Sequence, residues 1–475
     1  MTQIAMIAGY LVLTAAVSLY FVKRAKQNTS AFYTASRSMP MIVVSALLFS
    51  EIIAGAGTIG NAANAYSGGL SNAVWANWGM ALGCFLVAAT VSKFYRAMSV
   101  GYGAMTIPEA FAVMFGQRVR TLMMFIVALV YVILYSSQAT AASTILSPLL
   151  GLDETLTTWL FTAFFILIAI FGGMFGISWM GVVHTAVMFV GVFIVAVASV
   201  DHAGGIEVLT GELPRSFFSI IGERPANTLA SALGTAISFL ASSNVTSALF
   251  GAKSKRSANW GIVLAGIMVI PFAVLPALTG MCARVALPDI NASSALFRMA
   301  DSLGPIYSGI LSMAIIAAIW STGPTLLLIV SATMTKDLYL VAIKKDATEK
   351  QQLRFSYVII IIAGILGTWL GMNGGSILDN MLGAFQIRSI VGIVLLAALI
   401  WLRVNGQSAF WSMLGGGATA AVWFFAGNPW GIAPLWPGAL ICFLVLIPTT
   451  LVAKEKVSDG YAKYIEARGK LDTVK

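Results

Sequence analysis

Residues 45–60 decide the fold, and they read Ser45-Ala46-Leu47-Leu48-Phe49-Ser50-Glu51-Ile52-Ile53-Ala54-Gly55-Ala56-Gly57-Thr58-Ile59-Gly60. They lie inside an apolar stretch, 41–66, that is long enough to cross a lipid bilayer as a helix. Within ten residues, 51–60, it combines the carboxylate of Glu51 with three glycines, each of which costs about 1 kcal/mol relative to alanine inside a helix. The sequence therefore predicts a membrane span that is interrupted near its middle.

A second interruption is predicted five spans later, where the chain reads Leu240-Ala241-Ser242-Ser243-Asn244-Val245-Thr246-Ser247. Interrupted helices in corresponding positions are the best sequence indication of a transporter built from inverted repeats. The alternative is that the glycines and serines only let neighbouring helices approach closely. The five-span separation favours the transporter, with core repeats at about 41–200 and 229–402.

The composition excludes a soluble globular protein. Of the 475 residues, 59% are hydrophobic and 10% are charged, whereas soluble domains carry about 25% charged residues. The net charge of +10 would suggest a nucleic-acid partner in a soluble chain, but a membrane protein gathers Lys and Arg in its cytoplasmic loops. We therefore predict a single all-α domain over residues 1–475 in a lipid bilayer, with no nucleic-acid partner.

Thirteen stretches have the roughly 20 mainly apolar residues that a span needs. Their approximate limits are 3–22, 41–66, 70–92, 121–147, 156–177, 180–200, 229–250, 258–282, 305–331, 355–373, 379–402, 408–427 and 434–453. With the N-terminus outside, the great majority of the 28 Lys and Arg residues fall on the cytoplasmic side, as the positive-inside rule requires. This predicts a multi-pass protein of the cell membrane with a cytoplasmic C-terminus.

Four groups of short motifs follow one another in order along residues 30–340. They are Phe32-Tyr33 with Arg37-Ser38-Met39-Pro40, Phe171-Gly172-Gly173-Met174 with Ser178-Trp179, Ala252-Lys253-Ser254, and Ala317-Ala318-Ile319-Trp320-Ser321-Thr322 with Asp337-Leu338-Tyr339. Together they resemble the sodium:solute symporter family. The resemblance implies a LeuT-like core of two inverted five-helix repeats, with one extra N-terminal helix at 3–22 and two C-terminal helices at 408–427 and 434–453.

The same resemblance implies a sodium site between the second and ninth spans. Its ligands would be the backbone carbonyls of Ser50, Ile53 and Ala318 and the hydroxyls of Ser321 and Thr322. Sodium is a hard cation, and an unwound helix with nearby hydroxyls supplies oxygen ligands without added charge. The alternative is that both hydroxyls bond back to their own helix. Many family members carry Asp where this chain has Gly181, which favours a single coupling ion.

Glu51 and Arg388 are the charges that lie well inside predicted spans. A charge at mid-membrane costs about 3 kcal/mol on insertion scales, so both are candidates for function. The planar guanidinium of Arg388 suits capture of a carboxylate, and Glu51 can hold a substrate amine, support sodium or bind a proton. The alternative is that Glu51 and Arg388 pair with each other or with other groups as a structural lock. His184, in the sixth span, is interpreted as a hydrogen-bonded structural residue.

The other solute-site candidates are the polar residues of the seventh span and two residues elsewhere. They are Ser242, Ser243, Asn244, Thr246, Trp78 and Gln386. An unwound segment exposes main-chain and side-chain polar groups to a cavity. No metal-ligand cluster or catalytic constellation is recognisable in the sequence, so we predict that the protein is not an enzyme.

The sequence therefore predicts sodium-coupled import of a small organic solute by alternating access. An amino acid or another carboxylate is favoured over a sugar if Glu51 and Arg388 both reach the cavity. Proton coupling through Glu51 is the first alternative. The second is a transporter-like membrane sensor, which would need a separate signalling partner.

Overall fold

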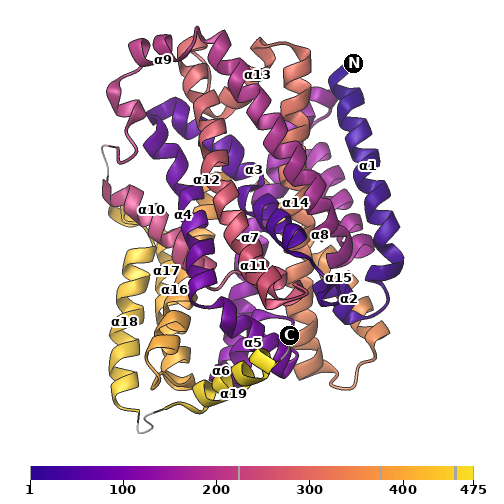
Figure 1. The fold of residues 1–475 in the computed structure, drawn as a ribbon, viewed down its shortest axis with the longest axis vertical. Coiled ribbons are helices and arrows are strands. Elements are labelled where there is room, and N and C mark those ends of the chain that lie inside the picture. The colour runs from indigo at the N-terminus through magenta and orange to yellow at the C-terminus, as the bar shows by residue number, and fades with distance from the viewer. Residues whose placement is uncertain (1, 223–224, 374–376, 454–456, 474–475) are drawn as a thin grey trace.

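The computed structural model describes residues 2–222, 225–373, 377–453 and 457–473. The regular secondary-structure elements in these ranges are helices, and most long ones run along the long axis of the molecule (Figure 1). The long helices and the two halves of the seventh predicted span are α1 (Thr2–Ala25), α3 (Met41–Gly68), α4 (Leu70–Ala89), α7 (Gln117–Leu150), α8 (Glu154–His202), α10 (Pro225–Phe239), α11 (Ser243–Gly251), α12 (Lys255–Ala286), α14 (Pro305–Thr333), α15 (Glu349–Met372), α16 (Ile377–Ile400), α17 (Gly406–Phe425) and α18 (Leu435–Leu451). Shorter helices are α2 (Thr29–Thr34), α5 (Ser92–Tyr102), α6 (Ile107–Phe115), α9 (Ile206–Glu212), α13 (Ala295–Ser302), α19 (Asp459–Thr473) and the π-helix η4 (Met334–Ile343).

Both predicted interruptions are present. In α3 the backbone of Ala54 leaves the helical region, with φ 45° and ψ 177°, and the segments on either side of the break differ in direction by 46°. Gly55 serves close packing, because a Cβ there would lie 2.6 Å from the Cγ1 atom of Ile319 on α14. The second interruption separates α10, which ends at Phe239, from α11, which begins at Ser243.

The 49-residue helix α8 folds back on itself at Gly173, where φ is 48°. Ring-to-ring steps of 6.0, 6.3 and 5.9 Å connect Phe161 to His184 through Trp320 and Tyr10. A straight helix would separate Phe161 from His184 by about 35 Å. The chain therefore reverses at Gly173, and α8 contains two antiparallel segments that correspond to the predicted spans 156–177 and 180–200.

Nine helices of the described ranges are long and apolar enough to cross a membrane, and the bent pair in α3 raises this number to ten. In this number α8 is a single helix although its chain reverses at Gly173, and neither α17 nor the 17-residue α18 is included. The fold is therefore an all-helical polytopic bundle, as predicted. The total of thirteen spans and the limits of the two repeats stay predictions.

Helix α14 lies in the interior of the bundle. Every residue from 314 to 333 is buried, and a helix that is apolar and covered on all sides belongs to the core of a large bundle. Peripheral helices instead present large apolar side chains outwards, such as Leu19 on α1, Trp369 on α15 and Leu440 on α18. An enclosed α14 can therefore place polar groups where neither bulk water nor lipid reaches them.

Candidate functional site

A cluster of oxygen atoms connects α3 to α14 just before the break in α3. The hydroxyl of Ser321 lies 2.9 Å from the carbonyl oxygen of Ser50 and 2.8 Å from that of Ala318. The hydroxyl of Thr322 lies 3.1 Å from the Ala318 carbonyl and 3.4 Å from the Ser321 hydroxyl. We call these four atoms the oxygen cluster; Ile53, the fifth predicted ligand, is buried and directly precedes the non-helical Ala54.

The donor set of the oxygen cluster suits a small hard cation. A serine hydroxyl carries one hydrogen, so Ser321 cannot donate to the Ser50 and Ala318 carbonyls at the same time. At least one close pair of oxygen atoms is therefore without a hydrogen between them. A cation that prefers oxygen ligands would relieve this repulsion without needing a carboxylate. The back-bonding alternative is present for both hydroxyls, because Ser321 and Thr322 each lie within hydrogen-bond distance of the Ala318 carbonyl. It does not explain the contact between Ser321 and the Ser50 carbonyl of α3.

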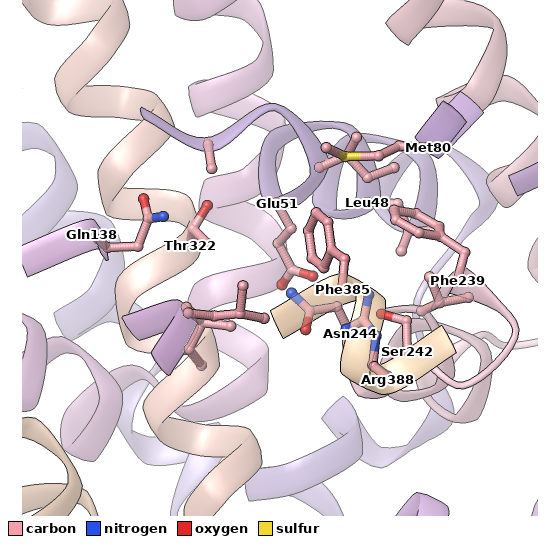
Figure 2. Close-up of a pocket in the computed structure, with 15 residues that line it drawn as sticks. Leu48, Glu51, Met80, Gln138, Phe239, Ser242, Asn244, Thr322, Phe385 and Arg388 are labelled. Carbon is pink, nitrogen blue, oxygen red and sulfur yellow. The ribbon is translucent and has the colours of Figure 1, made fainter. Parts of the chain in front are cut away.

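A cavity of about 40 Å³ lies beside the cluster, enclosed by both interrupted spans together with α4, α7, α14 and α16. The walls include five predicted site residues (Figure 2). They are Glu51, Ser242, Asn244, Thr322 and Arg388. A cavity needs roughly 10 to 15 Å³ for each water molecule, so this one holds a few waters. An amino acid or a sugar requires its walls to move apart.

Glu51 brings an uncompensated carboxylate to this cavity. The residue is 6% exposed, and neither side-chain oxygen has a hydrogen-bond partner. Figure 2 shows the carboxylate and the side chain of Asn244 pointing towards one another. Among the described residues, no ion pair joins Glu51 to Arg388. Of the structural-lock alternative, pairing of the two residues with each other is therefore absent, whereas Arg388 does bond to other groups.

Arg388 is held by neighbours that leave one nitrogen atom free. Its Nε donates to the Ser238 hydroxyl at 2.8 Å and its Nη1 to the Tyr131 hydroxyl at 3.0 Å. The Phe385 ring centroid lies 5.0 Å from the guanidinium carbon, a favourable cation–π distance. Nη2 is buried and has no partner. The guanidinium is thus oriented in advance, with one donor available to a ligand.

Two uncharged residues of the site were not predicted from the sequence. Gln138 on α7 lines the cavity, and its side-chain oxygen is buried without a partner, as is that of Asn244. The Tyr131 hydroxyl accepts from the Asn244 backbone at 3.1 Å as well as from Arg388. Tyr131 therefore positions two cavity residues from a third helix. The available sequence signal was three consecutive polar residues, Ser136, Ser137 and Gln138, inside a predicted span.

Four predicted solute-site residues lie outside the walls of this cavity. Ser243 and Thr246 are buried within α11, and the Gln386 side chain accepts from the backbone of Leu435 at 3.2 Å. The indole of Trp78 donates to the carbonyl of Ile270 at 3.0 Å. None of the four is among the residues that line this cavity.

Trp78 gives a simple test of this placement. Replacing Trp78 by Phe removes the indole donor but keeps an aromatic ring, and we expect the solute KM to change by less than about twofold, as for substitutions away from a site. Initial-rate uptake assays would measure it. A tenfold rise in KM would place Trp78 in contact with the solute.

His184 is hydrogen-bonded through Nδ1 to the Tyr10 hydroxyl and is buried, which agrees with the structural interpretation. The contact joins α8 to α1, the extra N-terminal helix. Gly181, on the same helix, lies against the backbone of Leu47, because a Cβ there would be 3.0 Å from the Leu47 Cα. An aspartate side chain at this position would therefore crowd the backbone of α3, so the glycine permits this close approach of the two helices.

A polytopic bundle with two interrupted helices around an enclosed polar cavity and an oxygen cluster is the arrangement of a secondary membrane transporter. The family model described as "Sodium:solute symporter family" matches residues 32–416. The chain belongs to this family, and it is therefore a sodium-coupled solute transporter and not an enzyme.

Known proteins of similar length support this assignment. The high-affinity proline transporter PutP of Bacillus subtilis is 25% identical over 474 residues, covering 94% of this chain and 98% of the relative. The sodium/proline symporter of Escherichia coli is 23% identical over 424 residues, covering 84% and 81%. A solved structure of a Na+-coupled sialic acid symporter, substrate-bound and outward-open, gives a TM-score of 0.80 at 17% identity, covering 95% of this chain and 97% of that chain. The fold is thus LeuT-like.

Proposed function

We propose that this protein imports a small zwitterionic amino acid together with sodium. The observation that carries the proposal is the set of unpartnered groups around one cavity. These groups are the acceptor oxygens of Glu51, Asn244 and Gln138 and the Nη2 donor of Arg388. Buried polar groups without partners are unfavourable, so a ligand that supplies the missing partners is strongly selected.

An amino acid matches this set with its two charged groups. Its ammonium group would donate to the Glu51 carboxylate and the neighbouring amide oxygens, and its carboxylate would accept from Arg388. A sugar offers hydroxyls but no charge, so it would leave both buried ions uncompensated. The proline transporters among the relatives act on a solute of this zwitterionic class.

The position of the oxygen cluster supports a role in sodium coupling. Its atoms come from α3 and α14, so an ion there would hold these two helices together beside the solute cavity. The ion can drive transport only if it binds the outward-open state better than the inward-open state. We propose a stoichiometry of one sodium ion per transport cycle. The distribution of Lys and Arg along the sequence supports a cell-membrane protein with the N-terminus outside.

The proposal is tested by uptake into proteoliposomes with a panel of solutes. The panel pairs each amino acid with its carboxamide, its desamino analogue and a sugar of similar size. We expect uptake of the zwitterion when an inward sodium gradient is imposed, and at least tenfold less of the other three. Preferred uptake of the sugar would refute the proposed solute class.

Two further conditions separate the alternatives. Uptake that follows an imposed pH gradient and ignores sodium would select proton coupling through Glu51. Binding of a solute without any uptake under either gradient would favour a sensor. Sodium-dependent accumulation against a solute gradient contradicts both.

A further inference from the structure

A second, larger pocket lies between the end of α4 and the first residues of α5 and α12, apart from the solute cavity. Its volume is about 570 Å³. The residues that line it include four cations, Lys93, Arg96, Lys255 and Arg256, together with Asn259 and Trp260. Its described lining contains no acidic side chain. The pocket is therefore a concentrated positive site at the edge of the bundle.

Arg96 shows that this charge is built into the fold. The residue is 6% exposed, and its Nη1 donates to the carbonyls of Leu249 at 3.0 Å and Ala252 at 3.1 Å. Its Nε is buried and has no partner. Burial, followed by the nearby cation of Arg37, lowers the pKa of Arg96 to about 10, so the guanidinium is still charged at neutral pH. A buried cation with a spare donor indicates an anionic ligand.

The chemistry of the pocket favours a phosphate group. Arginine and lysine are the side chains that bind phosphate oxygens. Helix α12 begins at Lys255, with Ser254 as its N-cap, and the backbone N–H groups of a helix N-terminus also favour anions. Lys93 and Arg256 are exposed, so their side chains are accessible to a headgroup that enters the pocket from the side.

The surroundings of the pocket favour a lipid as the source of this phosphate. The pocket lies at the last residues of the apolar helix α4 and the first residues of α12, where the distribution of Lys and Arg predicts the cytoplasmic membrane surface. Trp260 is 55% exposed beside the cations. Tryptophan is enriched at the level of lipid headgroups. Ile267, about two turns further along α12, is 52% exposed and offers an apolar surface to an acyl chain. Basic pockets between membrane helices on one face bind anionic headgroups.

We propose that this pocket binds the headgroup of an anionic phospholipid. Because Arg96 also bonds to Leu249 near the end of α11 and to Ala252 just after it, the bound lipid would stabilise the helix that begins beside Asn244 at the solute cavity. The inference concerns lipid binding and does not depend on which solute is transported.

The test is a lipid-binding measurement by native mass spectrometry on the full-length protein in a neutral detergent. The probes are phosphatidylglycerol, phosphatidylcholine and inorganic phosphate. We expect phosphatidylglycerol to bind at least tenfold more tightly than phosphatidylcholine. The double variant Lys93→Gln with Arg256→Gln should weaken phosphatidylglycerol binding about 30-fold, since each basic residue near an anionic lipid contributes about fivefold.

Two control variants make the result specific. Lys344→Gln with Lys345→Gln removes the same charge from exposed positions after η4 and should leave lipid binding unchanged. Lys93→Arg with Arg256→Lys keeps both positive charges and should retain phosphatidylglycerol binding. Equal binding of the two lipids, or equal losses in both charge-removing variants, would overturn the proposal. Displacement of phosphatidylglycerol by an equal concentration of inorganic phosphate would also overturn it, because the ligand would then be a soluble anion.

Discussion

The Ser321→Ala variant is expected to lose sodium-dependent uptake while it still folds. The Ser321 hydroxyl contacts the Ser50 carbonyl of α3 at 2.9 Å, so its removal takes away one proposed ion ligand and this contact between the two helices. We expect sodium affinity to fall by about 100-fold, at the upper end of what the loss of a group that orients metal ligands costs. The sodium concentration for half-maximal uptake measures it.

Substitutions at the neighbouring position separate the ion role from packing. Thr322→Val removes the hydroxyl at nearly constant volume and should weaken sodium binding strongly, whereas Thr322→Ser keeps the hydroxyl and should change it little. Ser312→Ala, at another buried position of α14, controls for loss of any serine in this helix. Wild-type sodium affinity in both Ser321→Ala and Thr322→Val would show that the ion lies elsewhere.

The interruption of the second span could be predicted from its glycines, but the residue that breaks the helix could not. The non-helical residue is Ala54, and the adjacent Gly55 meets Ile319 of α14. Glycine can supply either an unusual backbone angle or a close contact. Only the packing of α14, which lies far away in the sequence, decides which of the two each glycine provides.

The two charged site residues could be predicted because an ion inside an apolar span is conspicuous. Gln138 and Tyr131 could not, because an uncharged polar residue in a span is common and their roles depend on partners from distant helices. The contact of Tyr131 with Arg388 joins residues separated by 257 positions. Trp78 illustrates the opposite case, since its indole is turned to the Ile270 carbonyl by the rotation of α4 about its axis, which the sequence pattern did not determine.

Arg388→Gln is expected to abolish solute uptake because it removes the partner of the solute carboxylate. Glu51→Gln is expected to abolish uptake because it removes the partner of the solute ammonium group. Each change removes a charge and leaves the opposite solute charge buried without a partner. Glu51→Gln does so at nearly constant shape, whereas Arg388→Gln also removes the guanidinium bonds to Ser238 and Tyr131. Truncating one member of a buried charge pair costs about 2 to 5 kcal/mol, which is about 30-fold or more in affinity. Solute KM values and direct binding by calorimetry would measure both effects.

Solute analogues make this prediction specific for each residue. Wild type should prefer an amino acid over both its carboxamide and its desamino analogue. Arg388→Gln should lose the preference for the amino acid over its carboxamide and keep the preference over the desamino analogue. Glu51→Gln should lose the preference over the desamino analogue and keep that over the carboxamide, because each residue is proposed to face only one end of the solute. Arg388→Lys should fall in between, since lysine retains the charge but lacks the fork held by Ser238 and Tyr131. If both variants lose both preferences equally, Glu51 and Arg388 shape the cavity and do not contact the solute.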